Sequence, residues 1–307
     1  MNDDGREVFG WPDRIVTREG IYLVRGHMGK WIAMIALICT AFPLQAQERP
    51  LLTDVPDLVR LGAVRLDFGV SFLHRQRYPL SGLKGDLMRL GESSLRIGVG
   101  EFAEFQISGV FRDFLAITHR TPALISPTFA GDSTSDFGDL TIGTKLKLAG
   151  ETPNRPAVSF KFAVQLPNAS NESGLGTDET EFYASVLLLK QINRVRIVGN
   201  LGLAILGSAV QPNSQSDLLT YGFGLIAPVH ANLELVGEIH GRHGPQRPGN
   251  ESLSQMRAGA RFPAAGLLWD IAAIAGLRHF DPGYGLTVGV TYEFQAFHRK
   301  RSPVTIR

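Results

Sequence analysis

Two glutamates and a nearby histidine, Glu234, Glu238 and His240, have the residue types that general acid and base catalysis uses. In an extended strand, however, residues four apart are separated by about 13 Å, so the two carboxylates cannot share a proton. His243 and His279 are also candidates, but neither stands in a recognisable nucleophile motif, and a histidine without a partner of defined geometry indicates little. We therefore expect no catalytic residue in this chain.

The segment GDSTSDFGD carries three carboxylates, Asp132, Asp136 and Asp139, which offer the oxygen ligands that calcium prefers. Their spacing does not match an EF-hand, and glycine, serine and aspartate are the residues of any exposed turn. The sequence also has no Cys/His metal spacing, no HExxH motif and no glycine-rich phosphate loop. We expect neither a metal nor a cofactor, with a calcium-binding turn as the alternative.

Most charged residues alternate with apolar ones, which is the pattern of a β-strand with one polar and one apolar face. In the stretch Tyr284 to Phe294, every second residue from Leu286 onward is apolar, and small or polar residues stand between them. Twelve such segments follow one another from about residue 61. We expect an all-β fold, in which the apolar face meets either a protein core or lipid.

The N-terminal region contains a secretory signal, with a lysine before an apolar core from Trp31 to Phe42 and a small residue, Ala46, at the cleavage point. The core is shorter than the roughly 20 residues that a transmembrane helix needs. We expect a signal peptide over 28–46 and a mis-called start or leader extension over 1–27. The only cysteine, Cys39, lies inside the signal, so the mature chain has no thiol.

The connections between the predicted strands alternate in length. Short ones, as at 191–193 and 263–266, alternate with long ones rich in Gly, Ser, Pro and Asn, as at 74–84 and 114–137. Together with the signal and an even strand count, this asymmetry favours a transmembrane β-barrel in a Gram-negative outer membrane over a soluble sandwich. We expect a periplasmic segment over 47–60, a twelve-stranded antiparallel barrel over 61–294 and a basic tail over 295–307.

Several segments resemble a family of bacterial outer-membrane barrels named as channels of the meta-pathway of phenol degradation. The resemblance lies in RIGVGEFAEFQISG, FGDLTIGTKLKL, FAVQLPNASNESGLGTD, NLGLAI and LELVGEIHG, and it spans roughly residues 60 to 294. It implies a channel for small solutes, which the family relation suggests are hydrophobic or aromatic. Two features depart from the family: Asn168 follows the strand-end proline, and a tail follows Phe294, the aromatic residue that assembly machinery is expected to read.

If the apolar faces meet lipid, the charged residues of the polar faces line the lumen. The predicted lumen-lining set is Arg65, Glu104, Arg112, Lys145, Lys147, Lys161, Arg194, Arg196, Glu234, Glu238, Arg257, Arg261 and Arg278. Because unpaired charges are costly in a narrow space, we expect cross-barrel ion pairs, with a cation-lined passage as the alternative. The predicted aromatic girdle at the lower membrane interface is Phe262, Trp269, Tyr292 and Phe294.

The functional expectation is a passive channel and not an enzyme, with diffusion limited by inward side chains and by the 114–137 loop, if that loop folds inward instead of lying on the surface. Its expected partners are the lipid bilayer, lipopolysaccharide, the barrel-assembly machinery and a small solute. A net charge of +2 with no dense basic run interleaved with aromatics before the final residues gives no case for nucleic acid. The alternatives are an outer-membrane hydrolase and a soluble periplasmic β protein that binds a ligand.

Overall fold

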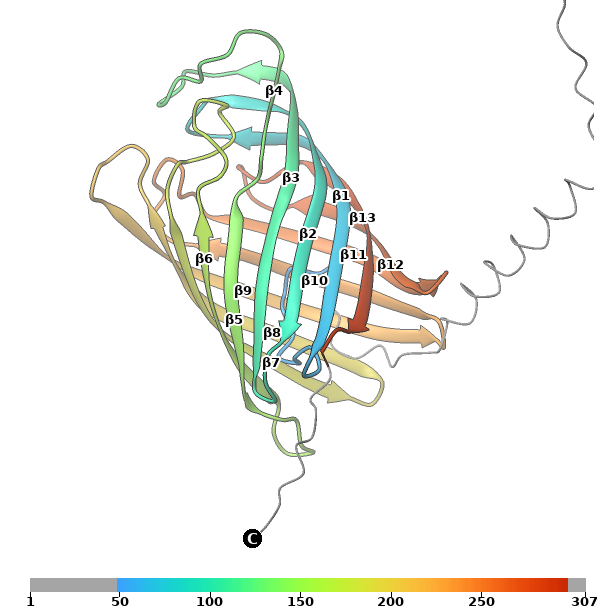
Figure 1. The fold of residues 1–307 in the computed structure, drawn as a ribbon. Helices are drawn as coiled ribbons and strands as arrows, with labels where there is room; N and C mark the ends of the chain where they lie inside the picture. The colour runs from blue at the N-terminus through green and yellow to red at the C-terminus, as the bar shows by residue number, and fades with distance from the viewer. Residues whose placement is uncertain (1–48, 298–307) are drawn as a thin grey trace, which may run out of the picture. The chain divides into compact units, whose positions relative to one another are not determined.

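The computed structural model describes residues 49–297, which form a closed antiparallel β-barrel (Figure 1). The strands are β1 (Ala63–Tyr78), β2 (Leu83–Gly98), β3 (Ala103–Arg120), β4 (Ser133–Asp136), β5 (Leu140–Ala149), β6 (Ala157–Leu166), β7 (Glu181–Ile192), β8 (Val195–Gly207), β9 (Gln215–His230), β10 (Leu233–His243), β11 (Leu253–Ala264), β12 (Leu267–Gly276) and β13 (Tyr284–Gln295). No helix among these residues is long and apolar enough to cross a membrane.

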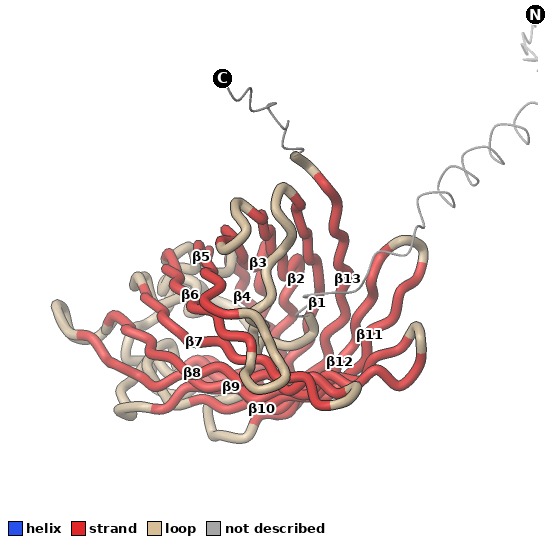
Figure 2. Tube along the Cα trace, turned by 90° about the horizontal axis from the view of Figure 1, so that it is seen from below, coloured by secondary structure: helices blue, strands red, loops and turns tan. Residues whose placement is uncertain are grey.

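The barrel closes because β1 pairs with β13 on one side and with β2 on the other, while β2 also pairs with β3. Figure 2 shows the strands following one another around the wall, with β1 beside β13. The short β4 and the longer β5 both pair with β3, one after the other, and so share one position in the wall. The wall therefore has twelve positions, and the predicted twelve-stranded barrel is confirmed.

The apolar faces of the strands point outward. In β13, Leu286 and Val288 are 47% and 38% exposed, whereas Thr287 and Thr291, on the opposite face, are 0% and 6% exposed. This distribution is the reverse of a soluble protein, in which apolar side chains are buried. It is the distribution of a barrel whose outer surface meets hydrocarbon and whose interior is polar.

The two ends of the barrel differ in their connections. The end that carries Ala63 and Gln295 is called the periplasmic end, after the side expected for short turns. It has tight turns such as Ala265–Gly266, where both residues have positive φ (53° and 75°) as a type I′ turn requires. The opposite, extracellular end carries most of the long connections. Two predicted loops are shorter than expected. Most of 74–84 belongs to β1 and β2, joined by a turn at Pro79–Gly82, and β3 continues through Arg120 into the predicted 114–137 loop.

The continuous apolar run VLLLK in β7 has apolar residues on both faces of the wall. Val186 and Leu188 are 40% exposed on the outside, while Leu187 and Leu189 are buried on the inside. Leu189 packs in an apolar cluster of the lumen surface, described below, which explains why an apolar residue points inward there.

The predicted signal peptide (28–46), the leader extension (1–27) and most of the basic tail lie outside the described residues.

Candidate functional site

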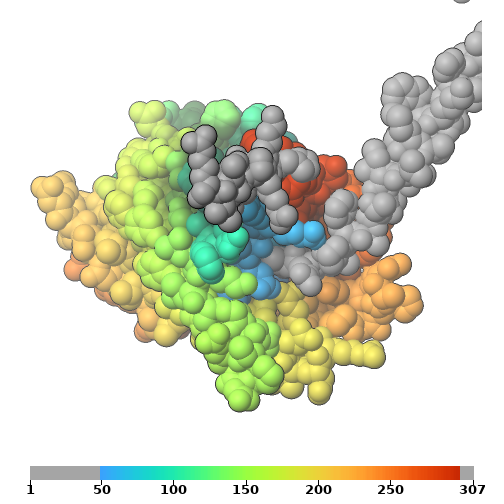
Figure 3. Space-filling view, turned by 60° about the horizontal axis from the view of Figure 1, so that its bottom comes forward, coloured from blue at the N-terminus to red at the C-terminus, as the bar shows by residue number. Residues whose placement is uncertain are grey.

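A segment before the first strand enters the lumen and fills much of its periplasmic half. We call residues 49–61 the plug segment. In it, Val55 and Val59 are 0% and 2% exposed, and Thr53 is 1% exposed. Figure 3, with the periplasmic end forward, shows these N-terminal residues in blue between the strands. The structure thus places residues 50–59, part of the predicted periplasmic segment over 47–60, within the periplasmic end of the barrel, and the bounds of that segment stay a prediction.

One carboxylate of the plug, Asp54, binds two lysines of the wall. Lys145 Nζ in β5 donates to Asp54 Oδ1 at 2.7 Å, and Lys161 Nζ in β6 donates to Asp54 Oδ2 at 2.7 Å. Lys145 also donates to the carbonyl of Val55 at 2.9 Å. Because Lys145 is fully buried, this contact satisfies a charge that would be very costly if left alone. Lower down, Arg196 Nη2 donates to Asp57 Oδ2 at 2.9 Å.

Two glutamates of the wall accept hydrogen bonds from the plug backbone. Glu238 in β10 accepts the N–H groups of Leu52 and Thr53 at 2.8 and 2.7 Å. Glu104 in β3 accepts the N–H of Val59 at 2.5 Å. An irregular segment inside a barrel has no strand ladder to satisfy its backbone, and these carboxylates supply the missing acceptors.

Apolar packing completes the docking of the plug. Leu51 and Val55 form a cluster with inward residues of β6 to β10, namely Ala157, Leu189, Val198, Ile226 and Val236.

At the top of the plug, Arg49 lies against a pair of glycines, Gly69 in β1 and Gly289 in β13, which are register partners. A Cβ at either glycine would come within 2.1 or 2.5 Å of the Arg49 guanidinium, so the two glycines make room for it.

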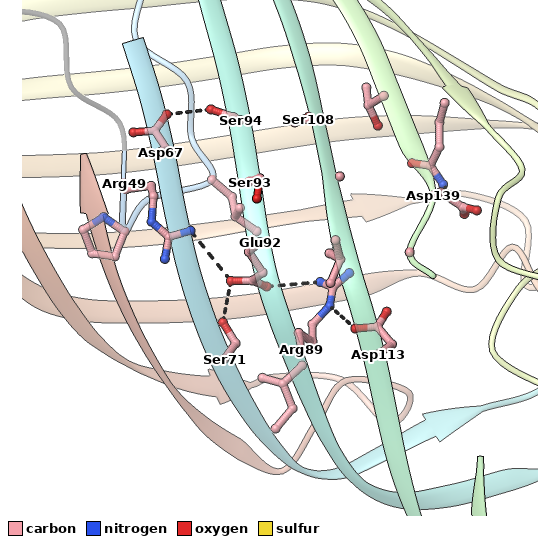
Figure 4. A pocket seen from close by; sticks show the side chains of 18 of the residues that line it. Arg49, Asp67, Ser71, Arg89, Glu92, Ser93, Ser94, Ser108, Asp113 and Asp139 are labelled. Carbon is pink, nitrogen blue, oxygen red and sulfur yellow. Dashed lines mark hydrogen bonds and ion pairs between the residues drawn. The ribbon is translucent and has the colours of Figure 1, made fainter. Parts of the chain in front are cut away.

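A cavity of about 630 Å³ lies above the plug. Its floor and walls are polar and form a chain of contacts across β1, β2 and β3 (Figure 4). Glu92 accepts a hydrogen bond from Ser71 at 2.6 Å and lies 3.8 and 3.6 Å from Arg49 and Arg89, while Arg89 reaches Asp113 at 3.2 Å. These charges are paired with neighbours along the wall or with the plug, whereas the expected ion pairs run across the barrel.

The roof of the cavity is apolar. Leu73, Leu83, Leu87, Leu115 and Ile274 form a buried cluster at the extracellular end. The connection from β3 to β4 contributes Phe129 to this cluster, so part of the predicted 114–137 loop folds inward. The cavity is thus amphipathic, with charged groups below and aliphatic groups above.

Most of the predicted lumen residues point inward. Arg65 pairs with Glu293, Arg261 with Glu234, and Arg257 donates to the carbonyl of Pro50 at 3.2 Å. Lys147 lies opposite Ser159, whose hydroxyl donates to the plug carbonyl of Pro56 at 2.6 Å. The inward set is Arg65, Glu104, Lys145, Lys147, Lys161, Arg196, Glu234, Glu238, Arg257 and Arg261.

Three predicted lumen residues lie elsewhere. Arg194 belongs to the exposed β7–β8 turn, and Arg278 to the exposed β12–β13 loop. Arg112 is on the outer face, in register with the exposed Leu90 and 5.1 Å from the ring centre of Phe137. Its facing differs because the wall contains a β-bulge at this level, where Gly91 has φ 69° and the β1–β2 register shifts. Strict alternation fails across a bulge.

The four predicted girdle residues lie on the outer face of β11 to β13 toward the periplasmic end. Phe262 and Trp269 are register partners, and the rings of Tyr292 and Phe294 stack with centroids 5.6 Å apart. Phe294 pairs with Val64 at the β13–β1 seam, where Ala296 and Phe297 continue with backbone bonds to Gly62. Their level in a membrane stays a prediction.

Two of the aspartates considered as calcium ligands, Asp136 and Asp139, hydrogen-bond to backbone N–H groups of a loop. Asp139 accepts the N–H groups of Asn168 and Ala169 at 2.9 Å, and Asp136 accepts that of Ser170 at 2.8 Å. The described residues contain no group of three or more acidic, histidine or cysteine side chains that could hold a metal.

A serine–histidine pair lies at the extracellular rim. Ser252 Oγ is 3.3 Å from His243 Nδ1, which meets the distance criterion for the hydrolase alternative. However, Ser252 is only 2% exposed, and its hydroxyl accepts bonds from the Gly244 N–H and from Gln246. A nucleophile needs an accessible oxygen, so this serine is better explained as the anchor of its loop.

The fold and the polar lumen define an outer-membrane type of β-barrel. Solved structures of similar fold include the COG4313 outer membrane channel from Pseudomonas putida F1, with a TM-score of 0.54, 13% identity, and coverage of 83% of this chain and 100% of that one. The NanC porin has a TM-score of 0.45 at 7% identity and covers 74% of this chain and 98% of its own. No family model and no curated protein matches the sequence.

Proposed function

We propose that this protein is a passive channel of the outer membrane, in which the plug segment limits passage to ions and small solutes. The observation that carries the proposal is the closed barrel with a polar compartment of about 630 Å³ above a segment held by wall ion pairs.

The amphipathic cavity supports a small solute with an aromatic ring and a polar group. Leu73, Tyr78 and Leu87 line its upper part, whereas Arg49, Arg89 and Arg257 line its lower part. An aromatic carboxylate or phenol would place its ring against the aliphatic roof and its oxygen toward the arginines. The family resemblance suggests the same solute class.

Two measurements test this function. The mature protein, purified from outer membranes and reconstituted in planar bilayers, should conduct ions in small steps, and correctly folded protein that never conducts would refute a channel. In liposome swelling, benzoate should enter faster than a neutral pentose of similar size, because only benzoate uses both the roof and the arginines. Recovery of the protein in the periplasmic fraction without detergent would instead favour the soluble ligand-binding alternative.

A further inference from the structure

The outer face of the extracellular end carries a row of basic side chains on three adjacent strands. Arg77 in β1 is the register partner of Lys84 in β2, and Lys84 is the partner of His119 in β3. Directly paired residues of antiparallel strands share a face of the sheet. That face is the outer one, because Leu83 next to Lys84 points into the buried roof cluster. We call Arg75, Arg77 and Lys84 the basic rim.

Arg75 joins the row through a bulge in β1. The β1–β2 register shifts between Leu73 and Gln76, and Arg75 has φ 59° and is exposed. The carboxylate on this face, Asp86, is already engaged, because it accepts the Arg75 N–H at 3.1 Å and pairs with His74 Nδ1 at 2.7 Å.

The basic rim has no anionic partner among residues 49–297. None of its three side chains is within ion-pair distance of a described carboxylate, and Arg77 donates only to the backbone carbonyl of His279. Like charges placed directly opposite one another, as Arg77 and Lys84 are, destabilise a sheet. A bound anion at this position would remove that repulsion.

The height of the basic rim relative to the lipid-facing surface indicates where the anion lies. Phe72, Met88 and Phe114 form a cross-strand row of exposed apolar residues on the same face. Lys84 stands four residues beyond Met88, which is about 13 Å along the strand and about 10 Å in height for a tilt of about 40°. Tyr284, 58% exposed, packs against His74 between the two levels, with ring centroids 4.6 Å apart. Amphipathic rings are typical of this level in a membrane interface.

We propose that the basic rim binds a phosphate of an outer-leaflet lipopolysaccharide molecule whose acyl chains lie on Phe72, Met88 and Phe114. Guanidinium groups bind phosphate oxygens in pairs, and a nearby lysine adds a point charge. The apolar row below supplies the surface that a free phosphate would not need. The proposal depends on the outer-membrane location and not on channel activity, so a protein that fails to conduct leaves it intact.

The test compares lipid binding by the wild type with that of a triple variant, Arg75→Gln, Arg77→Gln and Lys84→Gln. Native mass spectrometry of the full protein in mild detergent, titrated with diphosphoryl lipid A, should show about tenfold weaker binding by the variant, since charge-assisted bonds are lost. A matched variant at the other end, Arg60→Gln, Arg155→Gln and Arg194→Gln, removes the same charge and should bind as the wild type does.

Two further measurements distinguish a lipid phosphate from free inorganic phosphate as the bound anion. Lipid A lacking both phosphates should bind the wild type as weakly as diphosphoryl lipid A binds the triple variant. Inorganic phosphate at millimolar concentration should not displace the diphosphoryl lipid. Equal binding by the wild type and the triple variant, or displacement by inorganic phosphate, would overturn the proposal. Heat-modifiable migration on gels shows that each variant is folded before it is titrated.

Discussion

Lys145 of the barrel wall and Asp54 of the plug segment form a buried ion pair, with Nζ and Oδ1 separated by 2.7 Å. Lys145 is fully buried and Asp54 is 5% exposed. The pair connects a strand to a segment 91 residues earlier in the chain, and it couples the position of the plug to the charge of the wall.

The ion pair should control how firmly the plug is held. Asp54→Asn removes the nearer of the two carboxylates beside the buried Lys145, leaving only Glu104 at 3.8 Å, and it also removes the partner of Lys161. Breaking a buried ion pair costs about 3–5 kcal/mol. We expect the plug to leave its seat more often and the single-channel conductance in planar bilayers to increase. Asp57→Asn is the matched control, because the side chain of Asp57 is 33% exposed and its contact with Arg196 is worth less. Equal conductance of Asp54→Asn and the wild type would refute the role of the pair.

A disulfide should lock the plug in place. A Cβ at Gly222 in β9 would lie 3.3 Å from the Thr53 Cβ, close to the separation of about 3.8 Å found in disulfides. In the background of Asp54→Asn, the added pair Thr53→Cys and Gly222→Cys should suppress the extra conductance when oxidised and restore it after reduction. Because the only native cysteine is Cys39, in the predicted signal, no other thiol competes. Either single cysteine variant should be insensitive to reductant.

Cavity arginines should set the ion preference. Arg257→Gln removes a cation from the lumen, and we expect the reversal potential in a salt gradient to shift toward cation preference. Arg112→Gln removes the same charge from the outer face and should leave the reversal potential unchanged. A shift for Arg112→Gln, or none for Arg257→Gln, would contradict the facing of these two strands.

Signal cleavage should leave only a short extension before the plug. Cleavage after Ala46 would leave Gln47 and Glu48 ahead of Arg49, whose side chain lies near Asp270 and Glu92 in the lumen. We expect intact-mass analysis of protein from outer membranes to give a chain that begins at Gln47. A chain retaining residues 28–46 would show that the signal is not removed.

Much of the wall could be predicted from alternation alone. Leu286 and Thr287 lie on opposite faces of β13, as the period of two in a strand predicts, and the structure places Leu286 outward. The predicted facing of side chains was wrong where strands do not alternate regularly between polar and apolar residues. The bulge at Gly91 reverses the facing of Arg112, and the roof residues Leu83 and Leu87 are apolar although they point inward. Gly91, an isolated glycine in a strand, is a weak local signal of the bulge. The inward leucines have no such signal, because their burial depends on what lies across the lumen.

The plug could not be predicted for a related reason. Residues 50 to 59 have no periodicity and read as a connecting segment between a signal and a barrel. Their position depends on carboxylates and lysines that the sequence separates widely, such as Glu238 and Lys145, and that only barrel closure brings together. Equally, the pairing of Arg77 with Lys84 on the outer face depends on strand register.

The sequence by itself determined a wall of antiparallel strands, each with one apolar and one polar face, because the alternation of side chains between two faces is a local property of each strand. Only the tertiary structure decided that the lumen is occupied by its own N-terminal segment and which charges face each other across it. Those contacts join residues far apart in the chain, and their geometry depends on strand register, bulges and closure rather than on the composition of any one segment.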